Sequence, residues 1–237
     1  MVATIDAGLD IERHPDRKVA ASYSNIGNIY YRQGQLEQAL EYYRKALEID
    51  IKVSGQDSLD VAGSLNNIGI VLDEMGRLEE ALVLHQDSLD MQIRVVGGDT
   101  LDVATSFNNI GIVLSRVGDL ENALVQHQKA LEIRTRVLGS EHPSVACSYN
   151  NIGEVFRKAG KNEQALEMYT KSLEIKTRLY GGESHPDVAV SYQNVGKVHH
   201  SQGNGAVAKK MYNKAYHIFL KVLGPDHPRT QGVLNDL

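Results

Sequence analysis

A single block of sequence recurs along almost the whole chain, and this repetition constrains the fold more than any other feature. The core of the block is the tripeptide Asn-Ile-Gly, which reads Asn-Val-Gly in the last copy. Its asparagines stand at positions 25, 67, 109, 151 and 194, so the spacing is 42 residues three times and then 43. The extra residue falls between Gly181 and Ser184, which predicts a loop there. A repeat of this length is typical of units that stack on their neighbours to build one continuous core.

Each block contains the signals of two helices. A glycine at positions 34, 76, 118, 160 and 203 divides the blocks into two segments, each long enough for a helix. Both segments have apolar residues at helical spacing, as in Ile152, Val155 and Phe156. Another glycine, at positions 55, 97, 139, 181 and 224, suits a left-handed C-terminal cap, and Ser, Thr or Pro then restarts the chain. We therefore predict ten long helices in antiparallel pairs, one terminal helix and no strand.

The glycine of the tripeptide lies inside the first helix of each pair. Glycine in a helix interior costs about 1 kcal/mol relative to alanine, so its recurrence indicates that another helix crosses too closely for a side chain. The expected partner is a small residue of the second helix: Ala39, Ala81, Ala123, Ala165 and Ala208.

The first block, from Ala20 through Gly34 to Leu47, resembles the tetratricopeptide (TPR) consensus. The long period, the segment 130–146 and the Asn150-Asn151 pair are similar to the repeats of kinesin light chains. The resemblance implies an all-α fold, an α-solenoid in the form of a right-handed superhelix of antiparallel helix pairs. Its boundaries would be an N-terminal segment at 1–15, repeats at 16–57, 58–99, 100–141, 142–184 and 185–226, and a partial sixth repeat or capping helix at 227–237.

In such a solenoid the first helices line the concave groove, where the repeated asparagines form a ladder: Asn25, Asn67, Asn109, Asn151 and Asn194. Amide side chains have both donors and acceptors, which suits them to hold the backbone of an extended peptide. The alternative is that these amides cap or bridge neighbouring repeats, because polar side chains bond mainly to backbone or water.

Basic residues gather at the groove positions of repeats three to five: Arg116, Arg157, Lys158 and Lys197. Glu154 is the acidic residue among them, so the formal sum is positive although the chain is acidic. Clustered Arg and Lys can recognise carboxylates, whereas the alternative is a solvated charged face. The resemblance to kinesin light chains implies short acidic peptides with an aromatic residue as ligands. Asp73 and Glu74 depart from a uniformly basic groove.

Other features exclude several function classes. The net charge of −5 opposes attraction to nucleic acids and anionic lipids. No apolar run reaches the roughly 18 residues of a membrane span, and the opening residues lack a signal peptide, so we expect a soluble, cytoplasmic protein. His85 and His127 replace the tyrosines of other repeats and should be partly buried packing residues, and Cys147 should be a small packing residue. We expect no metal, no cofactor and no enzymatic activity, because no catalytic motif is present.

These features favour a non-enzymatic scaffold or adaptor that binds an extended or short helical acidic peptide in its groove. With only about 18 residues before the first repeat, it would be at most the cargo-binding part of a kinesin light chain, or an unrelated adaptor. The alternative is a structural scaffold that self-associates through its open solenoid ends. The sequence predicts that Val233 and Leu234 are exposed in the partial sixth repeat. This segment would then either cap the array or dock another copy in a weak homo-oligomer.

Overall fold

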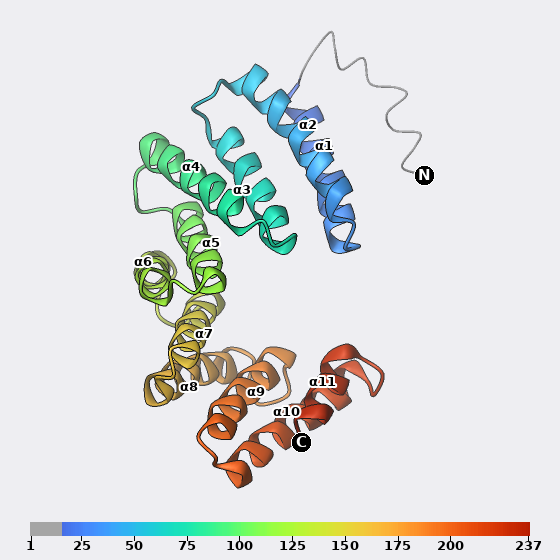
Figure 1. The fold of residues 1–237 in the computed structure, drawn as a ribbon, viewed down its shortest axis with the longest axis vertical. Coiled ribbons are helices and arrows are strands. Elements are labelled where there is room, and N and C mark those ends of the chain that lie inside the picture. Colours follow the sequence, from blue (N-terminus) through green and yellow to red (C-terminus); the bar gives the residue numbers. More distant parts are fainter. Residues whose placement is uncertain (1–15) are drawn as a thin grey trace. The chain divides into compact units, whose positions relative to one another are not determined.

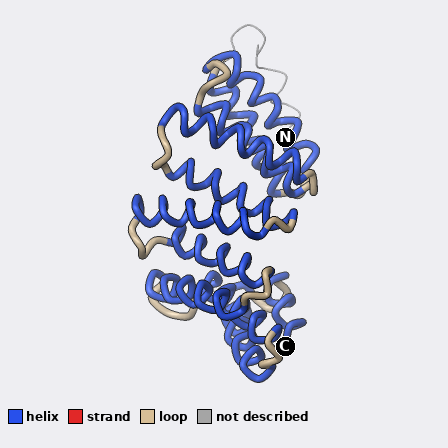
Figure 2. The backbone as a smooth tube through the Cα atoms, turned by 60° about the vertical axis from the view of Figure 1, so that its left-hand side comes forward, coloured by secondary structure: helices blue, strands red, loops and turns tan. Residues whose placement is uncertain are grey.

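Residues 16–237, the part of the chain that the computed structural model describes, consist of helices and short loops, with no strand among them (Figures 1 and 2). Contacts between Cα atoms divide the chain into one unit that ends at Val117 and another that begins at Gly118. The all-α fold of consecutive packed helix pairs is confirmed, with ten long helices and one short terminal helix in the described residues.

The first unit contains two complete helix pairs and one further first helix. Its helices are α1 (Arg17–Arg32), α2 (Leu36–Ser54), α3 (Leu59–Glu74), α4 (Leu78–Val96) and α5 (Leu101–Val117). Each of these helices packs against the next one along the chain. The central core of the unit lies where α2, α3 and α4 meet, around Leu40, Ile68 and Val71.

The second unit begins with a second helix and ends with a short first helix. Its helices are α6 (Leu120–Leu138), α7 (Pro143–Lys158), α8 (Asn162–Leu179), α9 (Pro186–Ser201), α10 (Gly205–Leu223) and α11 (Pro228–Asp236). Val233 of α11 is fully buried in a core with Tyr212 and Phe219 of α10, so the prediction that Val233 is exposed is wrong. Leu234 is exposed, as predicted.

The helix starts follow the predicted capping chemistry and add one residue type to it. The Ser58 hydroxyl accepts the backbone N–H of Val61 at 3.3 Å, in the usual N-cap manner. Where a helix begins with His-Pro, the imidazole is the N-cap: Nδ1 of His142 accepts a hydrogen bond from the backbone N–H of Ser144 at 3.1 Å. The same contact recurs at two later starts, those of His185 and His227. The junction histidines therefore cap helices, a role that the sequence analysis did not assign to them.

The glycines of the tripeptide allow close helix crossings, but the predicted partner is wrong. A Cβ added to Gly153 would lie 2.9 Å from ring atoms of Tyr169, and one added to Gly69 would lie 2.8 Å from His85 Cε1. Such distances are too short for real Cβ atoms, so an aromatic ring lies directly over four of these glycines: Gly27, Gly69, Gly153 and Gly196. The ring residue follows the predicted alanine by one helical turn in each pair. The ring, and not the alanine, fills the space that the missing glycine side chain leaves.

His85 is buried, with 1% of its surface exposed, which confirms its packing role. Its Nδ1 atom lies 2.8 Å from the side-chain oxygen of Asn66, which can only accept, so Nδ1 is the protonated nitrogen. Burial lowers the pKa of His85 to about 4, and burial does the same for His127, with a smaller effect of Arg134. Cys147, in contrast, is exposed, so its predicted role in packing is wrong.

Candidate functional site

We call the side of the first helices that does not pack on their second helices the inner face, and we treat each unit by itself. In the first unit it belongs to α1, α3 and α5, and in the second to α7 and α9. Of the nine predicted site residues, four are exposed, namely Asn25, Arg116, Lys158 and Lys197. The others are half-buried: Asn67, Asn109, Asn151, Asn194 and Arg157.

In the first unit an amide network links neighbouring first helices. The Asn109 Nδ2 group of α5 donates to Asn66 Oδ1 of α3 at 3.0 Å. The same oxygen accepts the proton of His85 Nδ1 from α4. Asn109 therefore bridges two repeats, which is the alternative considered for the ladder. One bond leaves further donor and acceptor capacity on each amide.

The second unit repeats this arrangement without the histidine. Asn194 Nδ2 of α9 donates to Asn150 Oδ1 of α7 at 2.7 Å. The bond again joins one first helix to the next, through the asparagine that precedes the tripeptide. Asn109 and Asn194 are thus held by the neighbouring repeat, and this restricts the rotamers of these two amides before any ligand arrives.

Arg116 of α5 forms an ion pair with Asp73 of α3. Arg116 Nη1 lies 2.7 Å from Asp73 Oδ1 and donates to the Asp73 carbonyl oxygen at 2.8 Å. In the sequence these two residues lie in separate repeats, and we predicted Arg116 as a groove cation and Asp73 as a departure from a basic groove. The structure brings them together, so the charge of Arg116 is largely balanced within the first unit.

Arg157 of α7 is engaged in the same way by a residue one turn before it. Its Nε and Nη2 groups donate to both oxygens of Glu154, at 2.8 and 2.6 Å. The Tyr169 hydroxyl of α8 donates to Glu154 Oε2 at 2.8 Å. Burial alone would raise the pKa of the Glu154 carboxyl, but these hydrogen bonds outweigh burial and lower it. Lys158 and Lys197, on the inner face beside this pair, are exposed.

A column of polar pairs between repeats was not predicted from the sequence. In the first unit, the Ser64 hydroxyl donates to Asp50 Oδ2 at 2.6 Å, and the Ser106 hydroxyl donates to Gln92 Oε1 at 2.9 Å. Each pair joins a second helix to the first helix of the next repeat. Burial raises the pKa of the Asp50 carboxyl, which the Ser64 bond only partly offsets.

In the second unit the same column is cationic. Arg134 Nη1 donates to the Ser148 hydroxyl at 2.8 Å, and Lys176 Nζ donates to the Ser191 hydroxyl at 3.2 Å. Burial lowers the pKa of both cations. The serine therefore recurs while its partner changes from a carboxylate through an amide to cations. Reading every forty-second position of the sequence would have revealed this pattern.

Two polar cavities open between the first helices of the first unit. One of about 300 Å³ lies between α1 and α3, where Asp50, Asp60 and Asn67 are among its lining residues. The other, of about 220 Å³, lies between α3 and α5 and shares Leu59, Gly63 and Asn67 with the first. The inner face of this unit is therefore hollowed between adjacent helices, with acidic and amide groups on the walls.

No group of three or more His, Cys, Asp or Glu side chains within 16–237 is arranged to hold a metal ion. None of the helices in that range combines the length and apolar character that a membrane crossing requires.

A family model described as tetratricopeptide repeat matches residues 18–94, 102–178 and 145–221. The chain belongs to the tetratricopeptide repeat family. Proteins of this family generally mediate protein interactions. No curated protein matches this tetratricopeptide repeat protein by sequence.

Several solved structures have a similar fold. BtubC (BKLC) from P. vanneervenii is 24% identical with a TM-score of 0.77, over 90% of this chain and 84% of that one. A kinesin light chain-like protein of Podosopora anserina with nearly identical TPR-like repeats is 19% identical, with a TM-score of 0.73 over 88% and 98% of the two chains. The apo form of RapI is also 19% identical, with a TM-score of 0.71 over 92% and 81%. At these identities the likeness is one of fold.

Proposed function

We propose that this tetratricopeptide repeat protein is a non-enzymatic adaptor that binds an extended or short helical acidic peptide on the inner face of its second unit. The supporting observation is the charge arrangement on α7 and α9. Glu154 is hydrogen-bonded by Arg157 and Tyr169, and the side chains of Lys158 and Lys197 are both exposed beside it, so three cations stand against one carboxylate. The inner face of this unit therefore presents positive charge to a ligand.

The amides of the ladder would hold the peptide backbone. Asn194 uses one N–H for Asn150, which leaves its oxygen and its second N–H for a peptide group. Asn151 lies one repeat before it at the same position. Backbone contacts of this kind tolerate many side chains, so the charges of the ligand would set its selectivity. The resemblance to kinesin light chains favours an aromatic residue within the acidic peptide.

Affinity should be modest, because charge pairing at a solvated surface is screened. We expect a Kd on the order of micromolar that rises with salt concentration. The test is a titration of labelled acidic peptides with an aromatic residue against the double variant Lys158→Glu and Lys197→Glu. The matched control is Lys209→Glu with Lys210→Glu, two exposed lysines of the second helix α10.

The inner-face variant should lose most of its affinity, and the control should keep it, because both variants change the net charge by the same amount. Equal losses in the two variants would mean that net charge and not the inner face determines binding, and the proposal would then be wrong.

A second candidate is self-association through the last two helices, α10 and α11. Leu234 of α11 and Val222 of α10 are 45% and 47% exposed, although α11 buries Val233. Exposed apolar side chains near the end of a helix array favour contact with another surface. Light scattering over a range of concentrations distinguishes this candidate from a monomeric adaptor.

A further inference from the structure

The larger inner cavity of the first unit has a glycine in its wall that helix packing does not explain. Gly63 lies inside α3, where glycine costs about 1 kcal/mol relative to alanine. A Cβ added to Gly63 meets no atom within 4 Å, in contrast to Gly69 of the same helix, which faces the His85 ring. Other repeats have side chains at the position of Gly63: Ala21, Thr105, Cys147 and Val190. The fold thus accepts a side chain here, and its absence leaves the helix backbone open to the cavity.

The position of Gly63 connects both cavities of the inner face. It lines the cavity between α1 and α3 and the cavity between α3 and α5, together with Leu59 and Asn67. A chain that passes from one cavity to the other crosses α3 over these three residues, with Gly63 in the middle. Glycine allows the closest approach of a ligand backbone to a helix, and Asn67 beside it has an amide for a peptide group.

Asp50 supplies a buried charge to the wall of the larger cavity. Asp50 is 7% exposed, and its Oδ2 atom accepts a hydrogen bond from the Ser64 hydroxyl. Its Oδ1 atom accepts no hydrogen bond from the described residues. A buried carboxylate is costly unless it is fully paired, so a donor of positive charge in the cavity would be favoured.

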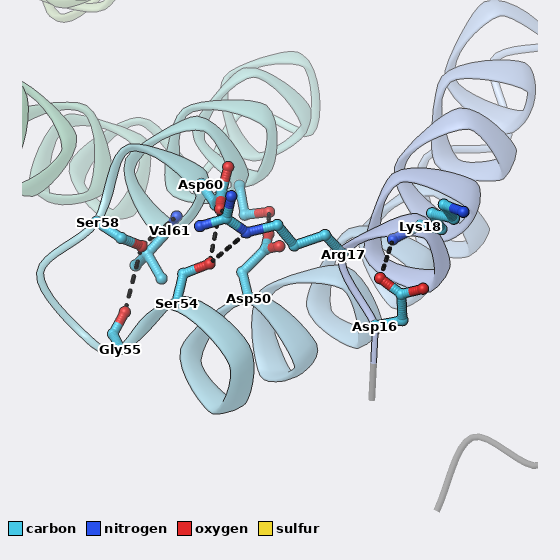
Figure 3. Close-up of polar contacts among 10 residues, drawn as sticks. Asp16, Arg17, Lys18, Asp50, Ser54, Gly55, Ser58, Asp60 and Val61 are labelled. Atoms are coloured by element: carbon cyan, nitrogen blue, oxygen red, sulfur yellow. Dashed lines mark hydrogen bonds and ion pairs between the residues drawn. The ribbon is translucent and has the colours of Figure 1, made fainter. Parts of the chain in front are cut away.

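The rim of the cavity already holds one guanidinium group. Figure 3 shows Arg17 reaching from α1 to Ser54 and Asp60, with Asp50 nearby. Arg17 Nε lies 3.3 Å from Asp60 Oδ2, and the Arg17 side chain is 70% exposed. An ion pair this exposed is worth about 0–1 kcal/mol, so a ligand can displace it. With Arg17 moved aside, two carboxylates face the cavity.

We propose that this cavity binds an extended peptide segment with a lysine or arginine side chain, whose cation reaches Asp50 and Asp60 while its backbone crosses Gly63. This goes beyond the proposed function, because it concerns the other unit and a ligand of opposite charge. The first unit thereby selects a basic residue in a partner protein, and Gly63 and Asp50 are the residues that determine this selection.

The experiment measures fluorescence anisotropy with labelled nonapeptides of alternating Ala and Ser that have arginine, citrulline or glutamate at the centre. Citrulline keeps the shape of arginine without its charge. The protein variants are Gly63→Leu, which fills the crossing point, and Asp50→Asn, which keeps an acceptor for Ser64. The matched control is Gly232→Leu in α11, where an added Cβ likewise meets nothing within 4 Å. Circular dichroism melting verifies that each variant is folded.

We expect the arginine peptide to bind the wild type about tenfold or more tightly than the citrulline peptide, as a charge-assisted bond requires. Gly63→Leu should remove binding, Asp50→Asn should remove the preference for arginine, and Gly232→Leu should bind as the wild type does. Equal binding of arginine and citrulline, undiminished binding by Gly63→Leu, or no binding of any of the peptides would overturn the proposal. Titration of the same variants with an acidic peptide separates its failure from that of the proposed function.

Discussion

His85 makes the stability of this protein sensitive to mild acid. The folded protein keeps the imidazole neutral, because the ring is buried and burial lowers its pKa to about 4. In the unfolded chain the same group takes up a proton near its ordinary pKa of about 6.5. Between these two values the unfolded state binds more protons than the folded state. The free energy of unfolding therefore falls as the pH decreases through this window.

The magnitude follows from the two pKa values. A difference of one pKa unit corresponds to about 1.4 kcal/mol, so the full effect below pH 4 is about 3 kcal/mol. From pH 7 to pH 5 the loss attributable to His85 is about 2 kcal/mol. A domain has a total stability of only about 5–15 kcal/mol, so a loss of this size is readily measured.

The assay is urea unfolding of the wild type and of His85→Phe at pH 7 and pH 5, followed by far-ultraviolet circular dichroism. Phenylalanine keeps a ring over Gly69 but has no proton to gain. It also loses the hydrogen bond to Asn66, so the variant should be less stable at pH 7. The decisive quantity is the change with pH, which should be about 2 kcal/mol smaller in the variant. The same change with pH in both proteins would mean that His85 is not the source of the acid sensitivity.

Three further predictions rest on other parts of the structure. Gly153→Ala should lower the free energy of unfolding by about 1–3 kcal/mol, because the new Cβ would press against the Tyr169 ring, as urea unfolding can measure. Gly63→Ala should raise the free energy of unfolding by about 0.5–1 kcal/mol, because a Cβ at that position meets no other atom and alanine favours the helix. A loss of stability in this variant would contradict the open space beside Gly63. Leu234→Asp should abolish any concentration-dependent dimer seen by light scattering, and a dimer that persists would move the contact away from the last helix.

Much of the fold could be predicted from the sequence because its signals are local and repeated. The 42-residue spacing, the cap residues and the helical periodicity all lie within one block, and they predicted the helix pairs that the structure contains. The partner of the tripeptide glycine could not be chosen in this way. Ala81 and His85 lie on the same side of α4, one turn apart, and only the packing of α4 on α3 decides which of them covers Gly69.

The site was harder to predict because its interactions cross from one repeat to the next. Arg116 and Asp73 are 43 residues apart, so a count of charges within each repeat placed them at separate positions. The buried pair of Asp50 and Ser64 also joins two repeats. Such contacts depend on the register between stacked helices, which the sequence of a single repeat does not contain.

The most direct test of the central proposal is to locate a bound acidic peptide on the second unit by nuclear magnetic resonance. Titration of the labelled protein follows the backbone amides of all helices and the side-chain amides of Asn151 and Asn194. We predict that the resonances of these two side chains and of the backbone amides of α7 and α9 shift with increasing peptide, with small changes in α8 and α10. Shifts confined to α8 and α10, or no shifts at saturating peptide, would contradict binding at the inner face.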